Sequence, residues 1–171
     1  YTDLKWFEQN AGGVMPLEIV IDTKKKNGLI RSTKPLDHIE TFQQFLLTQP
    51  ELGKPLGLTE GIKFAKQAFY DGDSNSYSVP SGTEMAFIAP YLKLVDEKAI
   101  PQANAAKSPT ALLSKFIDTD KRATRISVNM KDIGSAQLPI FLKRMDSATQ
   151  AIFDTANYHV QITGSSVTFL E

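Results

Sequence analysis

The hydrophobic residues of the first third of the chain follow two patterns in succession. Over residues 15–23 apolar and polar positions alternate, and this period of two predicts a strand. Residues 27–28, Asn-Gly, indicate a turn. From Pro35 to Pro50, a helix is expected, because apolar residues recur there at helical spacing. They are Leu36, Ile39, Phe42 and Leu46. A short strand is expected over residues 54–58.

The final third repeats this order. Residues 125–131 alternate apolar and polar side chains, as do residues 158–163, so both are predicted strands. A long helix capped by Ser135 lies between them, with Pro139 in or just beyond its first turn. Gly164 is expected to break or bulge the last strand. The buried face of the helix is expected to comprise Leu138, Phe141 or Leu142, Met145, Ala148 and Ile152.

The middle of the chain, residues 59–118, is predicted to be a helical insertion. Its first helix opens at Thr59 and closes near Gly72, with an expected buried face of Leu58, Ile62, Ala65 and Phe69. Residues 81–84 (Ser-Gly-Thr-Glu) have capping-box spacing and predict a second helix, ended or kinked at Pro90. A third helix is expected over residues 109–117, capped by Ser108.

A short helix is also expected at the start of the chain. Leu4, Trp6, Phe7 and Ala11 lie at helical spacing, and Gly12-Gly13 provides the C-terminal residues that such a helix needs. Trp6 and Phe7 are interpreted as docking residues of this helix rather than part of a cofactor site.

The resulting order is β-α-β, helical insertion, β-α-β. Two split βαβ units are typical of a ferredoxin-like α+β fold, in which helices pack on one face of the sheet. The 171 residues are interpreted as one domain made of a first half (1–58), the insertion (59–118) and a second half (119–171).

Composition excludes several classes of function. Nineteen Lys and Arg residues balance 19 Asp and Glu, so the clustered positive charge of a nucleic-acid-binding protein is missing. The chain has no cysteine, which excludes disulfides and thiolate chemistry. No apolar stretch approaches the ~18 residues that span a bilayer. Because the sequence starts at Tyr1 without a signal-peptide pattern, a processed chain or an excised piece is expected.

The candidate chemistry is sparse. The two histidines, His38 and His159, lie in different predicted elements and are expected to be surface residues. No serine lies in a nucleophile motif, and no glycine-rich phosphate loop precedes a helix. The chain is therefore predicted not to be an enzyme and to have no catalytic, cofactor or metal site.

Two polar clusters have alternative interpretations. Asp71, Asp73 and Asn75 have the spacing that opens a calcium loop, but Ser76 and Gly82 replace the required glycine and glutamate. A solvated turn is the preferred interpretation. Residues 24–26, three lysines, either attract anionic groups or form an exposed loop that protects a sheet edge, and the second role is favoured.

Four segments, in order, resemble a known family. They are residues 5–22 (KWFEQNAGGVMPLEIVID), 53–60 (GKPLGLTE), 122–128 (RATRISV) and 160–167 (VQITGSSV). Together they are similar to the second large extracytoplasmic loop of RND-superfamily exporters, in the MMPL or patched-like branch. Ala11 stands where that family usually has phenylalanine before paired glycines.

The resemblance implies a ferredoxin-like porter domain at the periplasmic face of the bacterial inner membrane. It would pack against the matching loop of the first half of the same exporter, which would use proton-motive force to export lipids or other hydrophobic compounds. The family's proton-relay residues belong to membrane helices, so none is assigned here.

Two other hypotheses remain open. One is a free-standing ferredoxin-like ligand-binding or adaptor protein of the bacterial envelope, and the other is a hydrolase that uses Asp71 and Asp73. An enzyme is expected to show titratable residues converging in a pocket. A porter domain is expected instead to expose an apolar groove or patch.

Overall fold

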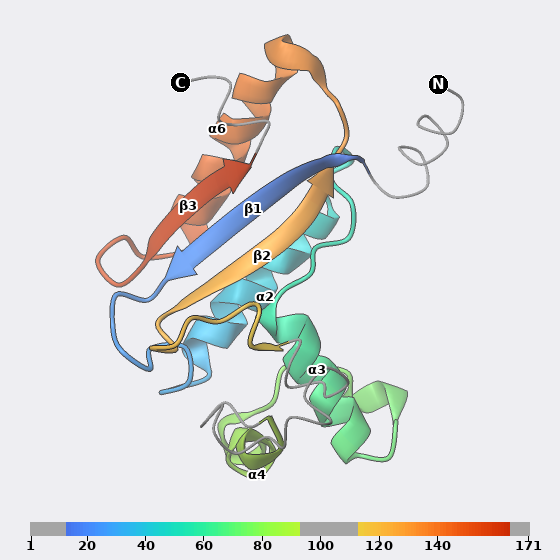
Figure 1. Cartoon of the computed structure of the whole chain (residues 1–171), viewed down its shortest axis with the longest axis vertical. Helices are drawn as coiled ribbons and strands as arrows, with labels where there is room; N and C mark the ends of the chain where they lie inside the picture. Colours follow the sequence, from blue (N-terminus) through green and yellow to red (C-terminus); the bar gives the residue numbers. More distant parts are fainter. Residues whose placement is uncertain (1–12, 93–112, 165–171) are drawn as a thin grey trace.

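The computed structural model describes residues 13–92 and 113–164. Over these residues the chain is an α+β protein with a three-stranded antiparallel sheet and four α-helices (Figure 1). In chain order the elements are β1 (Met15–Asp22), α2 (Lys34–Leu47), α3 (Leu58–Phe69), the 3₁₀ turn η1 (Ser74–Ser76), α4 (Gly82–Leu92), β2 (Ala123–Met130), α6 (Gly134–Ile152) and β3 (His159–Gly164).

The sheet has the order β2-β1-β3, and three of the four predicted strands, those over residues 15–23, 125–131 and 158–163, are confirmed. β1 pairs with β2 from Met15↔Met130 to Asp22↔Ala123. It pairs with β3 over its last six residues. One face of the sheet is apolar and buried, through alternate residues of β1 and β2, as the period of two predicts. These residues are Leu17, Ile19, Ile21, Ile126, Val128 and Met130.

Helices α2 and α6 both cover the apolar face of the sheet (Figure 1). The predicted buried face of α2 is confirmed, because Leu36, Ile39, Phe42 and Leu46 are all at most 1% exposed. Burying each such side chain contributes about 1.5–3 kcal/mol. Of the two alternatives for the buried face of α6, Phe141 is buried and Leu142 is half-buried.

The start of α6 differs from the prediction. Ser135 is not the cap, since the helix begins at Gly134 and Ile133 occupies the N-cap position without a side-chain hydrogen bond. The Asp132 carboxylate instead accepts the backbone N–H of Gly134, at 3.0 Å. Gly134 has a φ of 72°, a conformation that glycine adopts without strain, so it rather than a capping serine starts the helix.

The short strand expected at residues 54–58 is present only as two isolated bridges. Leu52 and Leu56 pair with Met130 and Ser127 of β2, on the edge away from β1. Leu52 and Leu56 are four positions apart, whereas their partners Met130 and Ser127 are three positions apart, so this segment contains one extra residue, as in a β-bulge. Pro55, which has no N–H to donate, lies inside it.

The first two helices expected in the middle of the chain are present, as α3 and α4. α3, η1 and α4 extend beyond one end of the sheet (Figure 1). α4 continues past Pro90 to Leu92, so the helix does not end at that proline. Of the helix predicted over residues 109–117, residues 109–112 lie outside the described residues; the prediction is wrong for the end of the segment, where residues 114–116 form a turn and Ile117 forms a bridge with Thr124 of β2. The opening helix with Leu4, Trp6 and Phe7 also lies outside them.

In the described part of the chain, no helix combines the length and the apolar character needed to cross a membrane.

Candidate functional site

Helix α3 is amphipathic in an unusual sense, because it buries lysines and exposes aromatic residues. Lys63 and Lys66 are only 5% and 7% exposed. Phe64 and Phe69 are 55% and 41% exposed. The prediction that Phe69 belongs to the buried face is therefore wrong. The two lysines take its place because each lies against an acidic residue of another segment.

Lys63 is the centre of a buried ionic network. Its ammonium lies 3.0 Å from the carboxylate of Glu40 on α2 and 2.6 Å from that of Glu60. The hydroxyl of Tyr77 donates to Glu60 at 2.5 Å, and the Lys63 ammonium lies 5.2 Å from the Tyr77 ring centroid. The network thus connects α3 to α2 and to the loop after η1.

Lys63, Glu60 and Tyr77 in this network have shifted pKa values. Burial alone would lower the pKa of Lys63, but its hydrogen bonds to Glu60 and Glu40 outweigh burial and raise it. Burial would raise the pKa of Glu60, yet the hydrogen bonds from Lys63 and Tyr77 lower it. Burial and the hydrogen bond to Glu60 raise the pKa of Tyr77 to about 12. All three shifts favour the paired state at neutral pH.

Lys66 makes the corresponding connection to α4. Its ammonium donates to the Ser78 hydroxyl at 3.0 Å and lies 3.0 Å from the carboxylate of Glu84. The same carboxylate accepts the backbone N–H of Ser81 at 2.8 Å, and this bond, followed by that of Lys66, lowers the pKa of Glu84 to about 2. The capping box predicted for residues 81–84 is confirmed.

An open apolar groove of about 880 Å³ lies next to the Lys63 network. Its lining comes from the bulged segment, from α3, from the Tyr77 loop and from the residues before β2. α3 approaches the residues before β2 closely, since a Cβ on Gly61 would lie 2.1 Å from a methyl carbon of Leu113. The apolar lining comprises Pro55, Leu56, Phe64, Leu113 and Phe116, and the polar lining includes Lys54, Glu60, Tyr77 and Lys115.

Three further aromatic side chains, outside the lining of the groove, are exposed on α3 and α4 or directly after α3. Phe69 and Tyr70 end α3, and Phe87 on α4 is 64% exposed. Isolated exposed apolar residues are ordinary, but an open groove with several of them marks a surface for an apolar ligand or partner. The groove is the candidate functional site.

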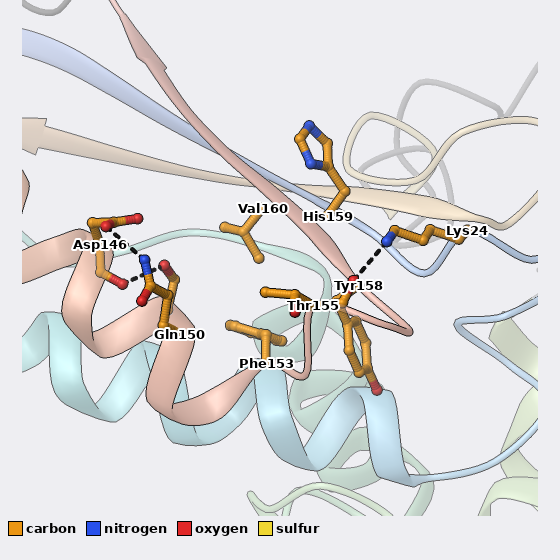
Figure 2. Close-up of a pocket in the computed structure, with 9 residues that line it drawn as sticks. Lys24, Asp146, Gln150, Phe153, Thr155, Tyr158, His159 and Val160 are labelled. Carbon is orange, nitrogen blue, oxygen red and sulfur yellow. Dashed lines mark hydrogen bonds between the residues drawn. The ribbon is translucent and has the colours of Figure 1, made fainter.

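A second, smaller pocket of about 190 Å³ lies between β3 and the end of α6 (Figure 2). Its charged and polar groups are mostly satisfied by the protein itself. Lys24 donates to the backbone oxygen of Thr155 at 2.6 Å, and Gln150 donates to Asp146 at 2.8 Å. Figure 2 shows His159 pointing to the opposite side of β3 from Tyr158. The pocket brings no catalytic pair together.

The histidines behave differently from each other. His159 is exposed, as predicted, but His38 is half-buried, so the prediction of a surface residue is wrong for it. The ring of His38 lies 3.2 Å from the Tyr158 hydroxyl and packs edge-on against Phe153. Burial, followed by the charge of Asp154, raises the pKa of Tyr158. His38 and Tyr158 are 120 positions apart, so no sequence spacing indicates this contact.

The Asp71, Asp73 and Asn75 segment closes α3 as a turn. Asp71 has a φ of 53°, and Asp73 accepts the backbone N–H of Asn75 at 3.1 Å as the cap of η1. Ser76 donates to the second oxygen of Asp73 at 3.1 Å. Across residues 13–92 and 113–164, no group of three or more His, Cys, Asp or Glu side chains is placed to hold a metal ion.

Each lysine of residues 24–26 has a partner in a neighbouring loop. Besides the bond from Lys24 to Thr155, Lys25 donates to Asn157 at 3.3 Å and Lys26 pairs with Asp120 at 3.4 Å. The three side chains connect the loop after β1 to the loops that precede β3 and β2. They do not form a cluster free to bind an anion.

Comparisons with known proteins identify no relative. No protein-family model matches the chain, and no curated protein or solved structure matches it significantly.

Proposed function

We propose that the chain is an extracytoplasmic porter domain of a proton-driven membrane exporter of the RND superfamily, MMPL or patched-like branch. In this role it contributes to the export of lipid or other hydrophobic compounds and performs no chemistry itself. The observation that carries the proposal is the open apolar groove of about 880 Å³ beside α3. The segments that resemble such exporters, among them residues 53–60 at the groove, support it independently.

The construction of α3 suits a surface that contacts passing cargo. Lys63 and Lys66 hold one side of the helix to Glu40 and Glu84, so its aromatic side stays exposed. Apolar contacts are non-directional and tolerate ligands of different shape, which an export pathway requires. The force for transport would come from proton-relay residues in the membrane helices of the parent protein.

We also propose that the fold is ferredoxin-like, with residues 52–56 as an irregular fourth strand. The support is a set of backbone hydrogen bonds to the free edge of β2: Leu56 N–H to Ser127 at 2.8 Å, Ser127 N–H to Leu56 at 2.8 Å and Gly53 N–H to Asn129 at 2.8 Å. With this segment the order becomes (52–56)-β2-β1-β3, which is the order of two interleaved βαβ units.

The proposed partner is the matching loop of the first half of the same exporter. The exposed aromatic residues outside the groove, Phe69, Tyr70 and Phe87, are the surface that we assign to this contact. Interfaces between domains of one chain commonly bury such aromatic residues.

The experiment is to find the native protein that contains this chain. An antibody raised against the 171-residue chain is used to probe membrane and soluble fractions of the source cells. The proposal predicts a membrane-bound band far larger than the 18.9 kDa of the chain, which protease added to spheroplasts degrades. A soluble band of about 18.9 kDa would reject the exporter and favour the free-standing ligand-binding or adaptor protein, since that alternative explains the groove equally well.

A further inference from the structure

We infer that the groove binds a single amphiphilic molecule with one long apolar chain and an anionic head, and that Lys54 and Lys115 select the charge of that head. The inference rests on the proposed function, because it assigns a ligand class to the same groove. It adds that head-group charge, and not apolarity alone, determines which molecules bind.

The groove offers positive charge to a ligand. Lys54, Glu60 and Lys115 are the charged residues in its lining. The Glu60 carboxylate is already bound by Lys63 at 2.6 Å and by the Tyr77 hydroxyl at 2.5 Å. Among the described residues, neither Lys54 nor Lys115 forms an ion pair, and both side chains are exposed. The charge of Lys54 also helps to lower the pKa of Glu60, but Lys54 and Lys115 together outnumber this one carboxylate, so the lining of the groove keeps a net charge of +1.

The shape and polarity of the groove also suit such a ligand. A volume of about 880 Å³ falls within the range of roughly 300–1,000 Å³ for sites of small-molecule ligands. Leu56, Phe64 and Phe116 are apolar lining residues, and no buried polar atom without a hydrogen-bond partner belongs to the residues that line the groove. Lysine side chains keep their ammonium groups in water while their stems cover apolar surface. An acyl chain that lies against the apolar lining, with its head in solvent beside the two lysines, matches this distribution of side chains.

The test compares two probes that share one acyl chain, cis-parinaric acid and its methyl ester, at concentrations below micelle formation; the ester lacks the charge and carries one additional methyl group. The wild-type chain should bind the acid more tightly, by roughly two- to fivefold for each lysine at low salt, the range of exposed ion pairs. Added salt should reduce this preference. The double variant Lys54→Met, Lys115→Met should bind both probes equally, with its affinity for the ester unchanged.

Two further variants act as controls. The pair Lys34→Met, Lys143→Met removes two exposed helix lysines outside the groove and should keep the preference for the acid. Phe64→Ser changes a side chain that is 55% exposed, so the fold should persist while both probes bind more weakly. Circular dichroism confirms that each variant is folded.

Several results would overturn the inference. Equal binding of acid and ester by the wild type, or a preference that survives in the Lys54/Lys115 variant, removes the role of the lysines. Unchanged binding by Phe64→Ser places the ligand elsewhere. A dimer that Phe64→Ser dissociates in sedimentation would make a second copy the occupant. If neither probe binds, the ligand assignment fails alone, because the membrane fractionation tests the exporter separately.

Discussion

Replacing Lys63 with methionine tests the ionic network that positions the groove. Methionine keeps most of the side-chain volume but removes the ammonium that lies 3.0 Å from Glu40 and 2.6 Å from Glu60. Breaking a fully buried ion pair costs about 3–5 kcal/mol, since a charge is left buried without a partner. The Glu40 and Glu60 side chains are 23% and 15% exposed, so water partly replaces the lysine. We therefore expect the free energy of unfolding to fall by about 2–3 kcal/mol.

The assay is urea denaturation followed by circular dichroism, at several pH values. In the wild type the pKa of Glu60 is lowered, so its contribution to stability is present above the unfolded pKa near 4.5 and is lost as pH falls through the folded value. In Lys63→Met the Glu60 carboxylate loses its cation and burial raises its pKa, so protonation of Glu60 relieves the variant. Its deficit relative to wild type should shrink between pH 7 and pH 4.

The matched control is Lys143→Met, at an exposed position of α6. It should change the free energy of unfolding by less than about 0.5 kcal/mol. A Lys63→Met variant as stable as this control, or with a deficit independent of pH, would refute the claim that the network anchors α3.

Two further predictions concern the same region. The pKa of Tyr77 is raised to about 12, so the contribution of its hydroxyl to stability should be complete below the unfolded value of 10.0 and disappear as pH rises through about 12. Unfolding of the wild type and of Tyr77→Phe at alkaline pH measures this contribution. Identical pH profiles of the two proteins would contradict the prediction. Gly61→Ala places a Cβ 2.1 Å from a Leu113 methyl carbon and should lower the free energy of unfolding by about 1–3 kcal/mol. Gly82→Ala, whose Cβ meets nothing within 4 Å, should not lower it in the same thermal denaturation. Equal effects of the two substitutions would show that Leu113 does not pack on Gly61.

Local patterns predict most of the elements of this fold. The alternation over residues 15–23 and the apolar spacing of α2 each specify one buried face, and the structure buries those residues. Ser81 and Glu84 form the capping box because both groups lie within one turn of helix. These features depend on neighbours two to four positions apart, which is the range that sequence spacing describes.

The errors occur where distant residues determine the outcome. Lys63 is buried because Glu40, 23 positions earlier, neutralises it, and this places Phe64 at the surface against the expectation from apolarity. His38 is half-buried because Tyr158, 120 positions later, packs against it. The groove itself combines residues from 54–64, from Tyr77 and from 113–116, so its existence depends on tertiary packing that periodicity does not describe.

The most direct test of the central claim is the side of the membrane on which this domain lies in the native protein. Because the chain has no cysteine, Gln150→Cys at an exposed position of α6 adds a single thiol to it. In a parent protein otherwise free of cysteine, a membrane-impermeant maleimide is applied to spheroplasts. The account predicts labelling of the membrane-bound protein before lysis. Labelling only after lysis, or labelling of a protein that remains in the soluble fraction, would contradict it.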